Sequence, residues 1–216
     1  MIMGSPKPPP EQEGEVDRVY KLLKGWILEA RMRPGDFVSE VDLARQCETS
    51  RTPVREACNL LSQEKWIQRI RHKGYALTPI SIRDIVEVYE YRKLLECFNA
   101  ERCAACSTAE EIKSLREIVS IEDHEMQPMT EILSANQNFH LHLGEIARNQ
   151  RIFDQLRLTL EYVQRLDVLS TQRDNRPVPH RDIIRAIEAR NVQEAGRAMA
   201  EHINVSRDQM LRLFGT

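Results

Sequence analysis

One short segment, Thr49-Ser50-Arg51-Thr52-Pro53-Val54-Arg55-Glu56-Ala57, constrains the fold of this chain most strongly. Proline is tolerated only in the first turn of a helix, so a helix must begin here, with Ser50 or Thr52 as its N-cap. At 100° per residue, Arg51 and Arg55 lie about 40° apart on one polar face. The opposite face is apolar and carries Val54, Ala57, Cys58, Leu60 and Leu61.

The polar face of this helix has the chemistry of a DNA-reading surface. Arginine forms bidentate hydrogen bonds with guanine O6 and N7 or with phosphate. A helix start rich in Arg, Ser and Thr therefore favours insertion into a major groove, with Ser50, Arg51, Thr52 and Arg55 as the contacting residues. The alternative is a solvated helix face, and the segment alone does not separate the two.

The neighbouring segments favour DNA binding. Apolar positions recur at helical spacing over residues 15–30, and residues 41–47 form a second short helix that Ser39 caps. Two short helices joined by a tight turn, the second carrying arginine, are typical of a helix-turn-helix. Two alternating runs, residues 66–71 and 75–78, then predict a β-hairpin wing. Its turn carries the candidate phosphate or minor-groove contacts His72, Lys73 and Gly74.

The segment Pro79-Ile80-Ser81 marks a predicted boundary between two domains. Residues 1–14 are polar and rich in proline, which predicts a disordered arm. Residues 15–80 form a winged helix-turn-helix of three helices and a hairpin, and residues 81–216 an all-α bundle, so the fold class is mainly α. In the second domain we expect helices at roughly 82–106, 108–126, 129–148, 151–171, 179–190 and 192–213.

Composition narrows the class of protein. Residues 1–80 carry 13 Lys and Arg against 11 Asp and Glu, while residues 81–216 carry 18 against 22, which agrees with an N-terminal nucleic-acid-binding module. The five cysteines lack the spacing of a disulfide framework, and we expect Cys103 and Cys106 to be small buried residues rather than metal or redox ligands. Without a signal peptide or a long apolar run, the sequence predicts a cytoplasmic protein with no membrane partner.

Three histidines on three predicted helices face the apolar side of their helix. These are His140, with Asn136 one turn before it, His180 and His202, whereas His142 points to water. Each buried imidazole needs partners, and a shared cation would supply one to all three. Imidazoles with an oxygen ligand suit Zn²⁺, Ni²⁺ or a related divalent ion. The predicted metal ligands are therefore Asn136, His140, His180 and His202; the alternative is a hydrogen-bonded polar cavity.

An arginine also lies on an apolar helix face. Arg92 falls between apolar residues of the helix at 82–106, and a buried arginine must be paired. Glu96, one turn further on, is one candidate partner within the helix. The functional alternative is that Arg92 lines the histidine cavity and binds an anionic ligand bidentately. Both readings stay open from the sequence.

Several of these pieces together resemble a known family. The segments Arg33-Pro34-Gly35-Asp36, Ser39-Glu40-Val41-Asp42-Leu43-Ala44 and the one that contains Pro53 resemble the winged helix-turn-helix of GntR-family bacterial transcription regulators. The second domain resembles the FCD, or fatty-acid-regulator-like, type of effector domain. Its matching pieces are Tyr89-x-x-Arg92-x-x-x-Glu96, Asn136-x-x-Phe139-His140, His180 and His202, and the resemblance covers about residues 15–213.

This resemblance implies a homodimer that places its reading helices in successive major grooves of a palindromic double-stranded DNA operator. The helical domain would bind a divalent metal that holds a small carboxylate effector, with Arg92 and Tyr89 beside it. Two departures are visible. Val41 stands where many relatives have Arg, which removes one contact, and Asn136 stands where many have Asp, which implies weaker metal affinity.

The function expected from these patterns is that of a transcription regulator, a repressor whose operator affinity is set by a small organic acid through a population shift. One alternative is a DNA-binding dimer without metal or effector. Another is a metal-dependent hydrolase that uses the three histidines and a bound water. Against the hydrolase, no acidic residue is expected on the inward histidine face, so we expect no enzymatic activity.

Overall fold

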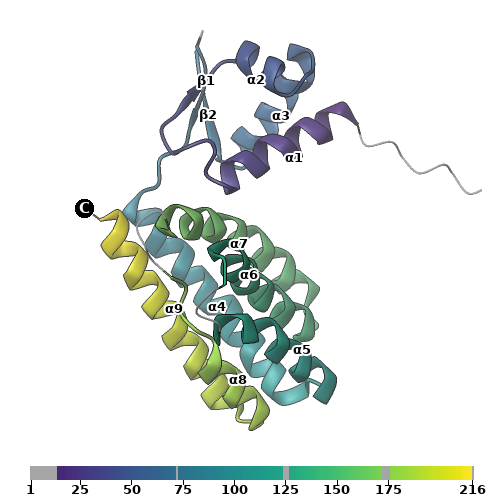
Figure 1. The fold of residues 1–216 in the computed structure, drawn as a ribbon, viewed down its shortest axis with the longest axis vertical. Coiled ribbons are helices and arrows are strands. Elements are labelled where there is room, and N and C mark those ends of the chain that lie inside the picture. The colour runs from purple at the N-terminus through teal and green to yellow at the C-terminus, as the bar shows by residue number, and fades with distance from the viewer. Residues whose placement is uncertain (1–13, 72, 124–126, 172–175, 216) are drawn as a thin grey trace, which may run out of the picture. The chain divides into compact units, whose positions relative to one another are not determined.

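The computed structural model describes residues 14–71, 73–123, 127–171 and 176–215, and the chain divides into two compact units after Pro79 (Figure 1). Apart from Gly14, the arm expected at residues 1–14 lies outside the described residues, and so does His72 of the wing turn. Within the described part of the chain, no helix is both long enough and apolar enough to cross a membrane.

The N-terminal unit is a winged helix-turn-helix. Its three helices, as expected, are α1 (Glu15–Leu28), α2 (Glu40–Gln46) and α3 (Arg51–Gln63). An antiparallel sheet of order β1-β3-β2 is built from β1 (Phe37–Val38), β2 (Ile67–Ile70) and β3 (Gly74–Leu77). The sequence pattern predicts the β2–β3 hairpin but misses β1, because a strand of two residues is too short to show an alternation.

The local sequence explains where α2 and α3 begin. The predicted cap of α2 is confirmed: the backbone N–H of Asp42 donates to Ser39 Oγ at 3.1 Å. Ser50 precedes α3 in an extended conformation, and Pro53 falls in the first turn, where it costs no hydrogen bond. Behind these turns the core of the unit buries Val19, Leu23, Ile27, Leu43, Val54, Leu61, Tyr75 and Leu77. This packing leaves the start of α3 at the surface.

The C-terminal unit is an all-helical bundle in which α4 and α9 lie side by side (Figure 1). Its helices are α4 (Ile82–Cys106), α5 (Ala109–Val119), a 3-10 turn (Ser120–Asp123), α6 (Met129–Ile146), α7 (Gln150–Thr171), α8 (Arg181–Glu188) and α9 (Val192–Phe214). Helix α8 starts later than residue 179, so the prediction that His180 lies on this helix is wrong. Pro177 and Pro179 disfavour the helical conformation in the residues before them, and His180 becomes the N-cap.

The core of this bundle is apolar but encloses several charged and polar side chains. Arg92, Glu96, Asn136, His140, Asp167, His180 and His202 are all buried. The five cysteines, all in the described part of the chain, are free thiols. Cys103 is buried as expected, but Cys106 is exposed at the end of α4, so the expectation of burial is wrong for it.

Candidate functional site

A charged cleft of about 360 Å³ lies in the N-terminal unit, where the first turns of α2 and α3 meet the wing. Arg51 and Arg55 project from α3 into this cleft with 62% and 49% of their side chains exposed, so both remain accessible to a partner. Lys73 and Gly74 join them from the wing, which unites four of the predicted DNA contacts. The full lining is Ser39, Glu40, Val41, Arg51, Arg55, Arg69, Ile70, Lys73 and Gly74.

The remaining predicted DNA contacts lie at the edge of this cleft or beyond the described residues. Ser50 and Thr52 are exposed at the start of α3 but do not line the cleft, and His72 lies outside the described part of the chain. Arg69, by contrast, lines the cleft from β2 and was not among the predicted contacts. Arg69 occupies an outward-facing position of the strand next to the turn, and this position is the sequence signal that could have indicated a DNA contact.

Gly74 is placed differently from the expectation of a turn-tip contact. It is the first residue of β3, paired with Ile70, and its φ of +123° is a conformation that L side chains rarely adopt. A Cβ at this position would collide with the backbone carbonyl oxygen of Val38 in β1. Glycine is therefore required here by the close approach of β1, whatever the wing touches.

The cleft also contains an acidic residue, Glu40, which was not among the predicted site residues. Arg55 holds the carboxylate of Glu40 from the side: Nε donates to Oε1 at 3.1 Å and Nη2 donates to Oε2 at 2.8 Å. Arg51 Nη2 donates to the same Oε2 at 3.4 Å, and the buried Tyr75 hydroxyl donates to Oε1 at 3.4 Å. The hydrogen bonds from Arg55 and Arg51 lower the pKa of Glu40 to about 2. The carboxylate is thus ionised at neutral pH.

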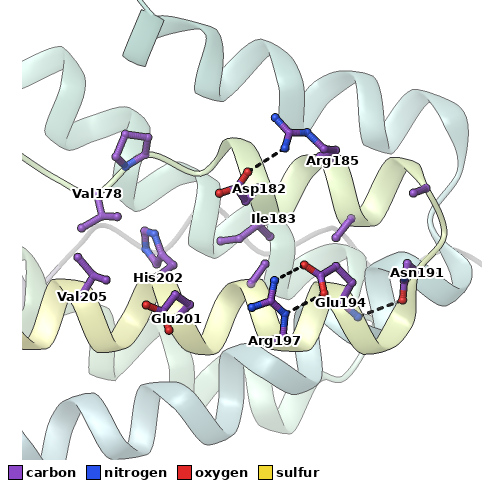
Figure 2. Close-up of a pocket in the computed structure, with 14 residues that line it drawn as sticks. Val178, Asp182, Ile183, Arg185, Asn191, Glu194, Arg197, Glu201, His202 and Val205 are labelled. Atoms are coloured by element: carbon purple, nitrogen blue, oxygen red, sulfur yellow. Dashed lines mark hydrogen bonds and ion pairs between the residues drawn. The ribbon is translucent and has the colours of Figure 1, made fainter.

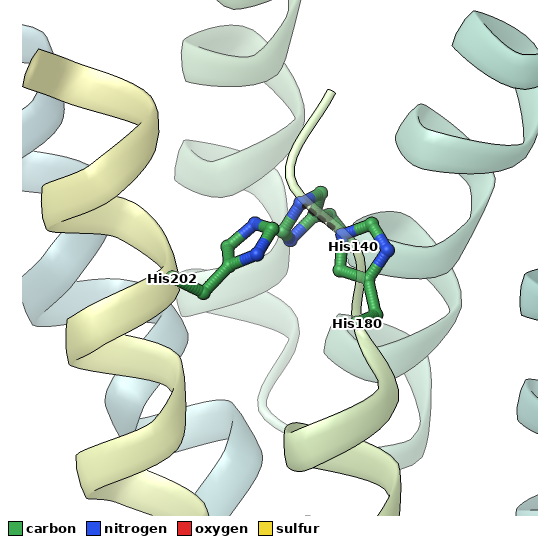
Figure 3. A group of neighbouring side chains, drawn as sticks. All are labelled: His140, His180 and His202. Carbon is green, nitrogen blue, oxygen red and sulfur yellow. Dashed lines mark hydrogen bonds between the residues drawn. The ribbon is translucent and has the colours of Figure 1, made fainter. Parts of the chain in front are cut away.

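In the C-terminal unit, the three predicted histidines converge on one point (Figure 3). His140 comes from α6, His180 from the residue before α8, and His202 from α9. Each histidine offers one ring nitrogen, and these three nitrogens lie within 4.8 Å of one another. All three side chains are buried. The ring centroids are 4.5 to 5.2 Å apart. The inward direction predicted from helical spacing is confirmed for His140 and His202.

The spacing and protonation of these histidines suit a divalent cation. The Nε2 atoms of His140 and His180 are 3.2 Å apart. A tetrahedral ion with Zn–N bonds of about 2.0–2.1 Å separates two ligand nitrogens by about 3.4 Å. Burial lowers the pKa of His180 and His202 well below the usual value, which keeps both imidazoles neutral and able to bind a metal. His202 Nδ1 is buried without a hydrogen-bond partner in the described residues.

A carboxylate lies directly behind this cluster, contrary to the expectation that no acidic residue reaches it. Glu96 Oε2 contacts His140 Nδ1, while Glu96 Oε1 accepts from Arg92 Nε at 2.7 Å. Burial raises the pKa of Glu96, but the charge of Arg92 and the hydrogen bond from His140 lower it well below its usual value. A carboxylate against Nδ1 favours the Nδ1–H tautomer and turns the Nε2 lone pair toward the cluster. Glu96 therefore orients His140.

Arg92 is thus paired as the sequence allowed, and it also contacts the histidine cluster. Its Nη2 lies 3.3 Å from His140 Nε2, and its side chain is only 2% exposed. The guanidinium stands 5.1 Å from the centre of the Tyr89 ring, so the two predicted effector residues are neighbours. Tyr89 and Arg92 also line a common cavity with His202.

Asn136 has an unforeseen partner. Its Nδ2 donates to Asp167 Oδ2, on α7, at 3.2 Å, and both side chains are buried. Burial raises the pKa of Asp167 to about 7, although the charge of Arg92 acts in the opposite direction. Asn136 and Asp167 line the same cavity as His202, which places amide and carboxylate oxygens near the cluster. No sequence signal marks Asp167, because its neighbours on α7 follow an ordinary amphipathic pattern.

Two spaces meet at His202. The inner cavity has a volume of about 10 Å³, room for about one water-sized particle but not for an organic acid. On the outer side, a groove of about 530 Å³ runs between α8 and α9 and also reaches His202 (Figure 2). Its floor is apolar, with Ile183 and Val205, and its rim carries two exposed ion pairs. These pairs are Arg185–Asp182 and Arg197–Glu194.

His142 lies apart from this cluster, as expected, but it is not free in water. Its side chain is 31% exposed, with Nε2 at 2.7 Å from Ser114 Oγ and Nδ1 at 3.1 Å from Glu145 Oε2. The prediction of a solvated imidazole is therefore wrong, because α5 packs over this side of α6. His142 therefore lies on the same helix as His140 but bonds to residues outside the cluster of His140, His180 and His202.

Two family matches divide the chain in the same way as its structure. Residues 15–77 match the family described as bacterial regulatory proteins, gntR family. Residues 87–205 match the FCD domain, which covers more than half of the chain. The charged cleft lies within the first match, and the histidine cluster lies within the second.

Individual proteins show the same similarity. Over 86% of its length, the chain is 30% identical to the Uxu operon regulator of Haemophilus influenzae, of which it covers 78%. It is 27% identical to the HTH-type transcriptional repressor RspR of Escherichia coli K12, over 86% of this chain and 84% of that protein. The fold is similar to that of E. coli McbR/YncC, with a TM-score of 0.76 at 16% identity over 93% of this chain and 99% of that chain.

Proposed function

Because this chain belongs to the GntR family of bacterial transcription regulators, with an FCD domain after its DNA-binding domain, we propose that it is a cytoplasmic homodimeric repressor released from its operator by a small carboxylate. In this proposal residues 15–80 bind DNA, and residues 81–216 bind the effector and dimerise. As a DNA-binding transcription regulator, the protein is not an enzyme. The observation that carries the effector proposal is the convergence of His140, His180 and His202.

The DNA contacts that we propose come from the charged cleft and the start of α3. Arg51 and Arg55 would read base edges or phosphates in the major groove, with Ser50 and Thr52 beside them and Lys73 on a phosphate. The exposure of both arginines on one edge of α3 supports this assignment. Val41 lines the same cleft and is exposed, but adds no charge, so its neighbours carry the electrostatic attraction.

The metal site that we propose uses the three histidines with an oxygen donor from Asn136 or Asp167. Neutral imidazoles and one oxygen suit Zn²⁺ or Ni²⁺. The support is the 3.2 Å separation of the His140 and His180 Nε2 atoms, together with the orienting contact from Glu96. When bound, such an ion would supply a Lewis-acidic site for a carboxylate oxygen. Arg92 and Tyr89 line the inner cavity beside His202, so in this proposal they would contact only the carboxylate end of the ligand.

The effector would reach the cluster through the groove between α8 and α9. The inner cavity is too small for an organic acid, whereas the groove falls in the size range of small-molecule sites. His202 lines both spaces, so a ligand in the groove can contact the cluster directly. An effector that binds one arrangement of the domain better than another would shift the population toward it and change the affinity for the operator.

The dimer that we propose forms through an apolar face of α4 and α7. Leu94 is 73% exposed, Tyr91 and Leu158 are 40% and 46% exposed, and the Tyr91 hydroxyl donates to Gln155 Oε1 across the two helices at 3.4 Å. Large exposed apolar side chains grouped on one face are typical of an interface. Leu94→Glu should convert the dimer to a monomer in light scattering, whereas Val192→Glu, on α9, should leave the mass unchanged. A dimer that survives Leu94→Glu would exclude this face.

A DNA-binding dimer without metal or effector is the second candidate. It is favoured by the fact that Arg92, Glu96 and His140 already contact one another, as a purely structural network would. A distance of 3.2 Å between His140 and His180 also suits an N–H···N hydrogen bond. The two candidates therefore differ in metal content and in ligand response.

Metal analysis and effector response separate these candidates. Protein purified without chelator should contain about one divalent ion per chain, and organic acids should raise its melting temperature only in the metal-loaded form. Replacing His140, His180 and His202 with Gln should abolish the release of DNA by such an acid while DNA binding persists. No bound ion together with unchanged melting on added Zn²⁺ or Ni²⁺ would remove the metal; loss of folding in the triple variant would favour the structural network.

A further inference from the structure

The guanidinium of Arg55 is held along one edge. Its Nε and Nη2 atoms donate to the two carboxylate oxygens of Glu40 at 3.1 and 2.8 Å. A guanidinium has five N–H donors in a rigid plane, so this side-on pair occupies two of them. The end of the group, formed by Nη1 and the outer N–H of Nη2, remains available. That end has the two parallel donors that match O6 and N7 of guanine.

Arg51 is held much less firmly by the same carboxylate. It makes one contact, from Nη2 to Glu40 Oε2 at 3.4 Å, and 62% of its side chain is exposed. It therefore keeps its rotational freedom, as suits a residue that follows a phosphate rather than a base edge. The two arginines on the same helix edge are thus distinguished by their contacts to Glu40.

Glu40 is itself firmly placed. Its side chain is only 14% exposed and belongs to the first turn of α2, where a negative charge is favoured. Its carboxylate also accepts a hydrogen bond from the buried Tyr75 of β3 at 3.4 Å. It therefore connects α2, α3 and the wing. A carboxylate anchored on two sides can orient an arginine that is anchored only by its own flexible stem.

We propose that Glu40 is a positioning residue that presents the outer edge of Arg55 to a guanine and thereby sets the discrimination between the operator and other DNA. The proposal rests on the DNA contact of Arg55 proposed above. Glu40 has a second effect, since it places one negative charge among Arg51, Arg55, Arg69 and Lys73. That charge weakens the sequence-independent attraction of phosphates, which dominates non-specific binding.

The test compares two duplexes: one recovered by selection from a random duplex library with the wild-type protein, and a scrambled duplex of the same composition. Binding is measured by fluorescence anisotropy at several salt concentrations. For Glu40→Gln we expect the affinity ratio between the duplexes to fall about tenfold or more, the loss of one bidentate base contact. Binding of the scrambled duplex should become tighter. The slope of log affinity against log salt concentration should become steeper by about one, the value of one phosphate contact.

Two further variants separate positioning from charge. Glu40→Asp keeps the charge but shortens the side chain by one methylene, so it should lower the ratio without tightening the scrambled complex. Glu56→Gln removes an equal charge from an exposed position of α3 and should leave the ratio unchanged. An unchanged ratio in Glu40→Asp, or equal behaviour of Glu40→Gln and Glu56→Gln, would overturn the proposal.

Failure of the underlying DNA contact would look different. If the wild-type protein selects no preferred duplex, the proposed base reading by α3 is wrong. If it selects one and the Glu40 variants retain the wild-type ratio, only the role of Glu40 is wrong. The conservative variant Arg55→Lys supplies a last control: because Lys cannot form the side-on pair, adding Glu40→Gln to it should change the ratio little further.

Discussion

Glu40 in the N-terminal unit and Asp167 in the C-terminal unit both carry a carboxyl group near an arginine, but their pKa values are shifted in opposite directions. Hydrogen bonds from Arg55 and Arg51 lower the pKa of Glu40 to about 2, whereas burial raises that of Asp167 to about 7. Glu40 faces a cleft with direct arginine partners, while Asp167 is enclosed and bonded to the neutral amide of Asn136. Direct hydrogen bonds from arginine lower the pKa of Glu40, and loss of hydration raises the pKa of Asp167.

The difference extends to the two regions as a whole. The arginines of the cleft are 62% and 49% exposed, so each keeps N–H donors available for DNA while it is paired with Glu40. The charges of the bundle are sealed from water, so each depends on its partner. A surface that must exchange partners needs the first arrangement, and a site that must hold a fixed geometry needs the second.

The largest expected effect tests the enclosed network. Glu96→Leu removes the partner of buried Arg92 and should lower the free energy of unfolding by about 3–5 kcal/mol. Glu90→Leu, at an exposed position of the same helix, should change it by about 0.5 kcal/mol or less. Urea unfolding of both variants measures the contrast. Equal midpoints would show that the buried pair contributes no more than a surface charge.

The next effect concerns pH. The folded pKa of Asp167, about 7, lies above the reference value of 3.8, so its stabilising contribution is complete below about pH 4 and is lost as the pH rises through 7. In chelator, this contribution of Asp167 to the free energy of unfolding should fall by roughly 4 kcal/mol across the window, at about 1.4 kcal/mol per pH unit. The lowered pKa values of His180 and His202 add a slope of the opposite sign that wild type and variants share, so the Asp167 contribution is read from their difference. Asp167→Asn should remove the slope that Asp167 contributes, whereas the exposed Asp154→Asn should keep it. Urea unfolding at several pH values measures this difference.

Metal binding should have a comparable effect on stability. At a free Zn²⁺ or Ni²⁺ concentration about a hundredfold above the dissociation constant, the protein should gain about 2.7 kcal/mol. His202→Gln should lose most of this gain, while His142→Gln should retain it because His142 bonds to Ser114 instead. Melting curves with added ion and with chelator measure both. If the added ion stabilises the two variants equally, the ion does not bind at the histidine cluster.

The smallest effect belongs to the exposed cleft. Arg55→Ala should weaken binding to a selected operator duplex by about 1–3 kcal/mol and relax its sequence preference, while thermal stability changes little. Arg45→Ala, on the exposed side of α2 with its own partner Asp42, serves as the control and should bind more nearly like the wild type. Anisotropy titrations measure the affinity. An operator affinity unchanged by Arg55→Ala would show that α3 is not the reading helix.

Local signals were sufficient for the order of the helices and for the direction of two of the histidines. Pro53 and Ser50 placed the start of α3, and the alternation after it predicted the β2–β3 hairpin. Helical spacing also predicted that His140 and His202 point inward. Each of these inferences uses residues within a few turns of one another, where chain geometry fixes which side chains share a face.

The partners were decided only by the tertiary structure. Glu40 meets Arg55 across 15 residues, Asn136 meets Asp167 across 31, and His140 meets His180 across 40. Helical spacing defines a face but does not say which other helix packs against it, so it could not identify Glu96 and Asp167 as neighbours of the cluster. The sequence by itself determined a helix that carries two arginines and a bundle with inward histidines. Packing determined which carboxylates accompany them, because burial and distance, which set their charge states, arise only when the helices meet.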